Sequence, residues 1–240
     1  MALSAADARV LAQLVDEAHA RLAAGDRVGM RQYLDEAADI DADAAGVQWL
    51  CGELALADGD LPQARACLQR AVEADPTHAD AHWALGRTHE ELGEHDAMLE
   101  HYAATRRLDA KADRLAGVGG KADFDHVEAV AERVLADLPE AIAQRLGNAP
   151  VVLETRPSAA LVGEGFDPRA LGLFEGAGDF EQRSEELAVA PTRIVLFVAN
   201  LLAVCPDDAT LAEQIEVTVL HEIGHYFGLD EDEVDALGLA

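Results

Sequence analysis

The sequence predicts an all-α solenoid of helical hairpins followed by a small α+β domain. Three observations support this prediction. Glycines recur at one constant spacing in the first half of the chain, at Gly25, Gly59 and Gly93. In the second half, residues 193–198 form an apolar, β-branched run that predicts a strand. Near the end of the chain, a long apolar segment predicts a helix that carries two histidines four residues apart.

The spacing of these glycines is shared by other residues. It also links Leu34 with Leu68 and Tyr102, Asp41 with Asp75 and Asp109, and Trp49 with Trp83. A glycine between two amphipathic helices at this period, together with Leu85-Gly86 and Asp75-Pro76, is similar to the tetratricopeptide-repeat family. The resemblance implies about three repeats, each burying its apolar face against the next, and a groove that binds a peptide or partner protein.

We assign no chemical role to the cysteines, tryptophans and histidines of this half. Cys51, Cys67, Trp49 and Trp83 fall at inward or inter-repeat positions, where we expect them to pack. Three cysteines without a C-x-x-C motif predict neither a disulfide framework nor a cysteine metal site. The histidines between residues 78 and 101 are expected to be solvated rather than metal-binding.

The composition shift after the repeats predicts a division into domains. We assign residues 1–115 to the repeats, residues 116–123 to a glycine-containing linker and residues 124–240 to a second domain. Apolar residues at helical spacing predict a helix that starts near Phe124 and continues past residue 138. Short apolar runs predict strands at residues 151–153, 171–174 and 193–198, followed by a turn or short helix at 199–204, the histidine-bearing helix and a last short helix.

His221-Glu222-Ile223-Gly224-His225 is the most informative motif of the chain. On a helix, residues four apart share a face, so His221 and His225 can direct both imidazoles at one zinc ion. Glu222 is one position further round the helix, where it can serve as the general base for an attacking water molecule. We predict that this helix begins at the acidic pair of residues 207–208 and is buried, because it is apolar round much of its circumference.

A catalytic zinc ion needs a third protein ligand and an open coordination position. Because the sequence ends at Ala240, soon after His225, we do not expect that ligand to come from a distant second helix. Gly228 suits a turn that folds the chain back, and Glu231 stands six positions beyond the second histidine. Glu231 is therefore the preferred third ligand, with Asp230 and Asp232 as the alternatives.

The second half carries three segments that match one known family. They are Leu171–Gly176, Arg193–Phe197 and His221–Leu229. On these segments, residues 124–240 resemble a small bacterial family of minimal zincin-like metallopeptidases. The resemblance implies a zincin-like fold, one Zn²⁺ held by His221, His225 and the acidic residue Glu231, and peptide hydrolysis. The larger metzincin group is not a full match, because its methionine turn lies beyond the third ligand and the last methionine here is Met98.

Composition narrows the classes of partner. The net charge of −28 repels phosphate backbones, so we expect no nucleic-acid partner. Such a surface favours basic peptides or proteins, or serves solubility alone. No apolar run is long enough to span a membrane and the N-terminus lacks a signal-peptide layout, so we expect no membrane association and a cytoplasmic location. The sequence does not indicate an oligomeric state.

Three functions follow from these patterns. The first is a zinc metallopeptidase whose repeats recruit a protein substrate, with the strand at 193–198 pairing with the extended substrate backbone. In that function, Tyr226 either polarises the substrate carbonyl or packs. The second is a tetratricopeptide scaffold with a structural or latent zinc site. The third is a metal-dependent amidase that acts on a non-peptide amide.

Overall fold

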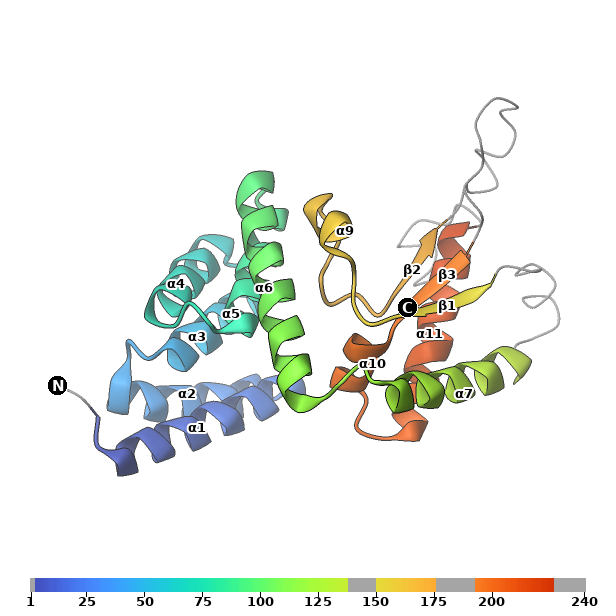
Figure 1. Cartoon of the computed structure of the whole chain (residues 1–240). Coiled ribbons are helices and arrows are strands. Elements are labelled where there is room, and N and C mark those ends of the chain that lie inside the picture. The colour runs from blue at the N-terminus through green and yellow to red at the C-terminus, as the bar shows by residue number, and fades with distance from the viewer. Residues whose placement is uncertain (1–2, 138–149, 176–192, 227–240) are drawn as a thin grey trace. The chain divides into compact units, whose positions relative to one another are not determined.

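A computed structural model describes residues 3–137, 150–175 and 193–226, and the side chains of residues 222–226 lie outside this description. The chain divides into two compact units, whose elements are labelled in Figure 1. The first unit comprises Met1–Asp109 and Ala159–Gly165, and the second comprises Ala110–Ser158 and Phe166–Ala240. Each unit is described by itself.

Three helical hairpins form most of the first unit, which confirms the predicted array of repeats. Their helices are α1 (Ala5–Ala23), α2 (Arg27–Asp41), α3 (Ala45–Ala57), α4 (Leu61–Ala74), α5 (Ala79–Glu91) and α6 (His95–Ala116). Each hairpin turns at a glycine with positive φ, which is 73° at Gly25, 75° at Gly59 and 70° at Gly93. Glycine lacks a Cβ, so this left-handed conformation costs it little.

Two further glycines allow the helices of a hairpin to approach closely. A Cβ on Gly86 of α5 would lie 2.5 Å from Cδ1 of the Tyr102 ring on α6. Gly52, the equivalent glycine of the preceding repeat, faces the side chain of Leu68 in the same way. The glycine at this position of the repeat pattern therefore marks the point where the two helices lie against each other in the second and third hairpins.

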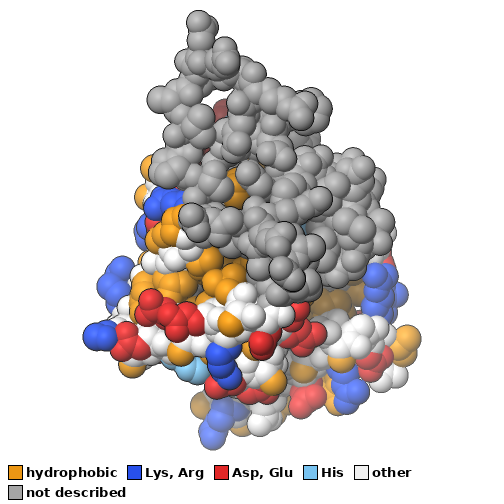
Figure 2. Space-filling view, turned by 90° about the vertical axis from the view of Figure 1, so that its right-hand side faces the viewer, with side chains coloured by type: hydrophobic (Ala, Val, Ile, Leu, Met, Phe, Trp, Pro, Cys, Tyr) orange, Lys and Arg blue, Asp and Glu red, His pale blue; other side chains and the backbone are white. Residues whose placement is uncertain are grey.

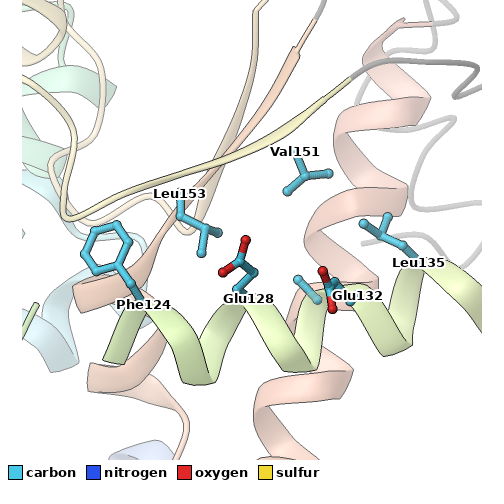
Figure 3. A pocket seen from close by; sticks show the side chains of 7 residues that line it. Phe124, Glu128, Glu132, Leu135, Val151 and Leu153 are labelled. Atoms are coloured by element: carbon cyan, nitrogen blue, oxygen red, sulfur yellow. The ribbon is translucent and has the colours of Figure 1, made fainter. Parts of the chain in front are cut away.

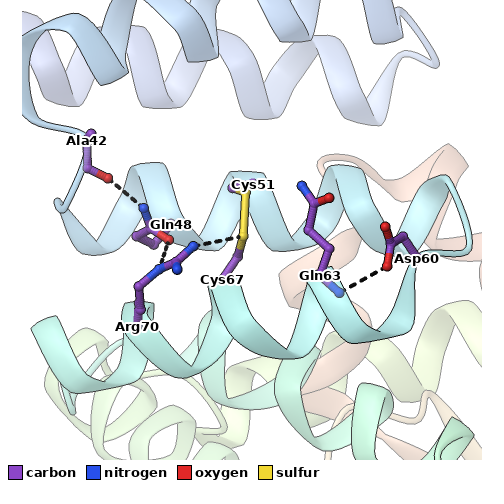
Figure 4. The surroundings of a disulfide bond; sticks show 7 residues. All are labelled: Ala42, Gln48, Cys51, Asp60, Gln63, Cys67 and Arg70. Atoms are coloured by element: carbon purple, nitrogen blue, oxygen red, sulfur yellow. Dashed lines mark hydrogen bonds between the residues drawn. A yellow bond between two sulfur atoms is a disulfide. The ribbon is translucent and has the colours of Figure 1, made fainter.

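The two cysteines of the second hairpin form a disulfide, which corrects the prediction that they only pack. Cys51 on α3 and Cys67 on α4 are bonded, with Cα atoms 6.0 Å apart (Figure 4). Beside them, the Nε of Arg70 donates a hydrogen bond to Oε1 of Gln48 at 2.7 Å. Counting cysteines missed the bond because the two residues, 16 apart in sequence, become neighbours only when the hairpin closes.

Three histidines of the third hairpin, His82, His89 and His101, are packed together, so the prediction that they are solvated is wrong, whereas His95 is exposed as predicted. The Nδ1 atoms of His82 and His101 are 3.0 Å apart, and the ring of His101 stacks on that of His89 at 5.4 Å. His89 is buried and its Nδ1 lies 2.6 Å from a carboxylate oxygen of Glu94. Burial, reinforced by His82 and His89, lowers the pKa of His101 to about 4, and burial also lowers the pKa of His82.

These lowered pKa values predict a pH-dependent stability. Between pH 6.5 and about 4 the unfolded chain binds a proton that folded His101 does not, so stability falls as the pH falls through this window. Over this window we expect the His101→Gln variant to lose about 1 kcal/mol less of its free energy of unfolding than the wild type. The effect is this small because the ring is partly exposed to solvent. Thermal unfolding of both proteins from pH 7 to 4.5 measures it. Equal losses of stability in the two proteins over this window would contradict the assignment to His101.

The second unit is a small α+β fold, as predicted. Its elements are α7 (Lys121–Asp137), β1 (Val151–Glu154), β2 (Gly172–Glu175), β3 (Arg193–Phe197), α10 (Val198–Val204) and α11 (Asp208–Tyr226). The strands form one sheet in the order β1-β3-β2, in which β1 is parallel and β2 antiparallel to β3. A buried core joins this sheet to α7, α10 and α11. The predicted last short helix lies outside the described residues.

The central position of β3 corrects two predictions. Residues Ile194–Phe197 are at most 1% exposed, because β3 has a paired strand on both sides. Both of its hydrogen-bonding edges are occupied, so the prediction that this strand pairs with an extended substrate is wrong. In the described part of the sheet, β1 and β2 are the edges, and β1 is half-buried rather than the buried strand that its apolar run predicted.

A buried polar network holds the two ends of the connection between β1 and β2, on either side of residues 159–165, within the second unit. The guanidinium of Arg156 binds the carboxylate of Asp113 through Nε at 2.5 Å and through a terminal nitrogen at 3.0 Å. Arg156 also donates to Oδ1 of Asn200, a residue that is 2% exposed. The Asn200 amide donates to the carbonyls of Pro168 at 3.1 Å and Ala170 at 2.6 Å. This network fixes the chain that leads into β2.

Helix α6 crosses the division between the two compact units, close to the predicted linker. Helix α6 continues to Ala116, and its residues from Ala110 onward belong to the second unit. Residues 117–120 separate α6 from α7 within the predicted linker of residues 116–123. The first unit also takes residues 159–165 from the second half. The division into a repeat domain of residues 1–115 and a catalytic domain of residues 124–240 stays a prediction.

Candidate metal centre

Helix α11 begins at a side-chain cap, as predicted. The carboxylate of Asp207 accepts hydrogen bonds from the backbone N–H of Thr210 at 2.9 Å and from its hydroxyl at 3.0 Å. These bonds hold the pKa of Asp207 below its usual value. The capped end fixes where the helix starts, and therefore which residues share a face further along it.

One row of apolar side chains buries α11 in the second unit. Leu211, Ile215 and Val219 are each at most 1% exposed, and they belong to the core shared with α7, α10 and the sheet. The row has the four-residue spacing expected of one helix face. One face of the helix is therefore buried as predicted, whereas Glu213 and Glu216 are exposed, and the packing of the buried face positions the final turns of the helix.

The final turns of α11 carry the H-E-x-x-H motif. His221, Glu222 and His225 all lie within the helix, so the two histidines share one face. His221 is half-buried. The side chains of Glu222 and His225, and all of Glu231, lie outside the described residues. Among the described side chains, no group of three metal-binding residues comes together. The donor set itself, two imidazoles and a carboxylate, fits zinc.

Strand β2 lies directly against α11. A Cβ on Gly172 would stand 2.5 Å from Cγ2 of Thr218 and 3.1 Å from the carbonyl oxygen of Val195. Only a residue without a side chain allows β2 to lie this close to the helix one turn before His221. Gly172 is thus a positioning residue, and the sequence signalled it only as part of the Leu171–Gly176 match.

We expect Gly172→Ala to destabilise the second unit by about 1–3 kcal/mol, because the new methyl group overlaps Thr218. The measurement is urea unfolding followed by circular dichroism. Gly163→Ala is the matched control, since a Cβ there meets no atom within 4 Å. Adding Thr218→Ser, which removes Cγ2, should recover part of the loss. Equal stabilities of Gly172→Ala and Gly163→Ala would contradict this account.

An ion pair closes the far end of the β2–β3 ladder. Glu175 and Arg193 are directly opposite in the register, and Nε of Arg193 lies 2.5 Å from Oε2 of Glu175. The bond to Glu175 raises the pKa of Arg193. Both residues fall in the segments that carried the family resemblance, and their pairing gives those segments a physical role in the sheet.

The second unit contains a cavity of about 350 Å³. Figure 3 shows its lining among the described residues, which consists of Phe124, Glu128, Ala131, Glu132, Leu135, Val151 and Leu153. These residues come from α7 and β1, and α11 contributes none of them. On the part of the face in Figure 2 that is not grey, acidic, basic and hydrophobic side chains are intermixed.

Comparisons with known proteins agree with the fold and the motif. Residues 146–239 match the family of zincin-like metallopeptidases, which covers the sheet and α11. Residues 51–113 match the tetratricopeptide repeat, which covers the second and third hairpins. No curated protein matched the chain. The chain therefore joins a tetratricopeptide-repeat region to a zincin-like metallopeptidase domain.

No helix among the described residues is long and apolar enough to cross a membrane. The predicted cytoplasmic location stays a prediction.

Proposed function

We propose that the chain is a zinc-dependent metallopeptidase that hydrolyses peptide bonds. The observation that carries this proposal is the H-E-x-x-H motif on the last turns of α11, a capped helix buried in a domain of the zincin-like family. A motif on an exposed or irregular segment would lack a fixed face for two imidazoles. Here the helix sets that face before any ion binds.

In the proposed site, His221, His225 and Glu231 would hold one Zn²⁺, which would supply Lewis-acid chemistry. Glu222 would accept a proton from the water that attacks the peptide carbonyl, and would return that proton to the leaving amine. Asp230 and Asp232 remain the alternatives to Glu231. Tyr226 is the phenol nearest in sequence for polarising the substrate carbonyl.

We place the substrate backbone along β2 rather than β3. In the described part of the sheet, β2 is an edge strand, and Gly172 brings it against α11 one turn before His221. An extended peptide can add to such an edge through main-chain hydrogen bonds. The same pairing is closed to β3, because β1 and β2 already occupy both of its edges.

The repeats would recruit the partner or substrate protein through the first helices of the hairpins. Trp49 and Glu53 on α3 have Trp83 and Arg87 as their equivalents in the next repeat, on α5. The guanidinium of Arg87 lies 4.9 Å from the centre of the Trp83 ring. Burial raises the pKa of Glu53, and Arg87 opposes that shift. Trp49 is buried, so the part of this row open to a peptide ligand is the partly buried Trp83 with the guanidinium of Arg87.

Cleavage of a peptide mixture, compared between the wild type and Glu222→Gln, tests the enzymatic proposal. New peptide termini that depend on Glu222 support a metallopeptidase. If both proteins bind a partner but neither cleaves a peptide, the chain is the alternative, a tetratricopeptide scaffold with a structural or latent zinc site.

A further inference from the structure

A short segment from the second half completes the core of the repeat array. Residues 159–165, which include the helix α9 (Ala159–Gly163), belong to the first compact unit. Val162 is 1% exposed and forms one apolar cluster with Met98 and Tyr102 of α6. Trp83 and Leu99 pack on the same cluster and are partly buried.

Equivalent positions of the repeats show what residues 159–165 cover in the array. Met30, Ala64 and Met98 are equivalent positions of successive repeats, at the start of the second helix of each hairpin. They are 0%, 0% and 4% exposed. In the first two hairpins the next hairpin covers this face, since α2 packs on α3 and α4 packs on α5. At Met98, residues 159–165 supply the cover.

Residues 159–165 approach α6 closely. Gly165 has a φ of 105°, a conformation that favours glycine, and a Cβ on it would lie 3.3 Å from Cε of Met98 and 3.6 Å from Cε1 of His95. Val162 is the residue of this helix that is buried in the apolar cluster. Ala159 and Ala160 lie on the exposed side of the same helix. The segment is therefore small enough to lie against the end of the array.

We propose that residues 159–165 are a built-in cap of the repeat array, occupying the place that the first helix of a fourth repeat would take. An end repeat leaves an apolar face that needs cover. The chain leaves the second unit after Ser158 and re-enters it at Phe166, shortly before β2 begins at Gly172. Release of the cap frees residues 159–165 alone, because the hydrogen bonds of Asn200 to Pro168 and Ala170 still hold the chain that leads into β2. The cap does not rest on the proposed function.

Hydrogen exchange of the full chain, followed by mass spectrometry, tests the cap. Val162→Asp places a charge in the apolar cluster, and we expect exchange at residues 96–105 of α6 to rise at least about tenfold. Val162→Ala should raise exchange in the same residues by less. Ala160→Asp puts the same charge on the exposed side of the same helix and should leave α6 as protected as in the wild type.

A local rise in α6, with α1, α2 and β3 unchanged, supports the cap. Equal protection of α6 in Val162→Asp and Ala160→Asp overturns it, as does a uniform rise across all the hairpins. If light scattering shows a wild-type dimer that Val162→Asp separates, a second copy covers the array end and the proposal fails. None of these readouts depends on zinc or on hydrolysis, so they are independent of the proposed enzymatic function.

Discussion

Replacing Glu222 by glutamine is expected to slow peptide hydrolysis by about 10²–10⁴-fold while the zinc content stays at one ion per chain. The amide has nearly the same shape as the carboxylate but cannot accept the proton of the attacking water. The two imidazoles are unchanged, so metal binding should persist. A loss of turnover without a loss of metal separates the role of a general base from that of a ligand.

The matched control for this experiment lies on the same helix. Glu216 is an exposed residue of α11, and Glu216→Gln makes the same chemical change away from the motif. Peptide cleavage and metal content would be measured for the wild type and both variants. Turnover in Glu222→Gln equal to that of Glu216→Gln would remove Glu222 from the mechanism.

The identity of the third ligand predicts the second large effect. We expect Glu231→Ala to weaken zinc binding at least about 100-fold, since it removes one of three protein ligands. Metal analysis after dialysis against a competing chelator, together with zinc titration by calorimetry, measures the change. Activity should fall in parallel, because a loosely held ion is lost at working concentrations.

Two neighbouring carboxylates provide the controls for the third ligand. Asp230→Ala and Asp232→Ala each remove the same charge at a position adjacent to Glu231. We expect both variants to keep stoichiometric zinc. A large loss of affinity in either one, with Glu231→Ala close to the wild type, would reassign the ligand to that aspartate. If all variants and the wild type fail to take up zinc, the proposed metal centre is wrong.

Features that repeat along the chain, or that arise within one helix, were predictable from the sequence. Gly25, Gly59 and Gly93 mark the hairpin turns because each turn needs a positive φ, which is a local requirement. The start of α11 was predictable for the same reason, since the cap at Asp207 depends on residues three positions away. The face shared by His221 and His225 follows from helix periodicity.

Features that depend on contacts distant in sequence were not predictable. The apolar run at 193–198 predicted a strand, but its central place in the sheet depends on β1 and β2, which lie elsewhere in the chain. The Cys51–Cys67 bond and the contact of Val162 with Met98 arise only when separate helices pack. The sequence around Val162, which is followed by glycines, gives no local sign that this side chain is buried rather than part of a loop. The ligand roles of His221, His225 and Glu231 and the general-base role of Glu222 stay predictions.

The Arg156–Asp113 pair has a consequence for dividing the protein into its halves. Asp113 lies on the last turns of α6, and Arg156 follows β1, so a cut near residue 115 places the two partners on different polypeptides. Each is less than a sixth exposed, and removing one partner of such a pair costs about 3–5 kcal/mol. A metallopeptidase fragment that begins after the repeats would therefore carry an uncompensated buried guanidinium. Low yield or inactivity of that fragment would reflect this lost counter-ion and not a missing recruitment function.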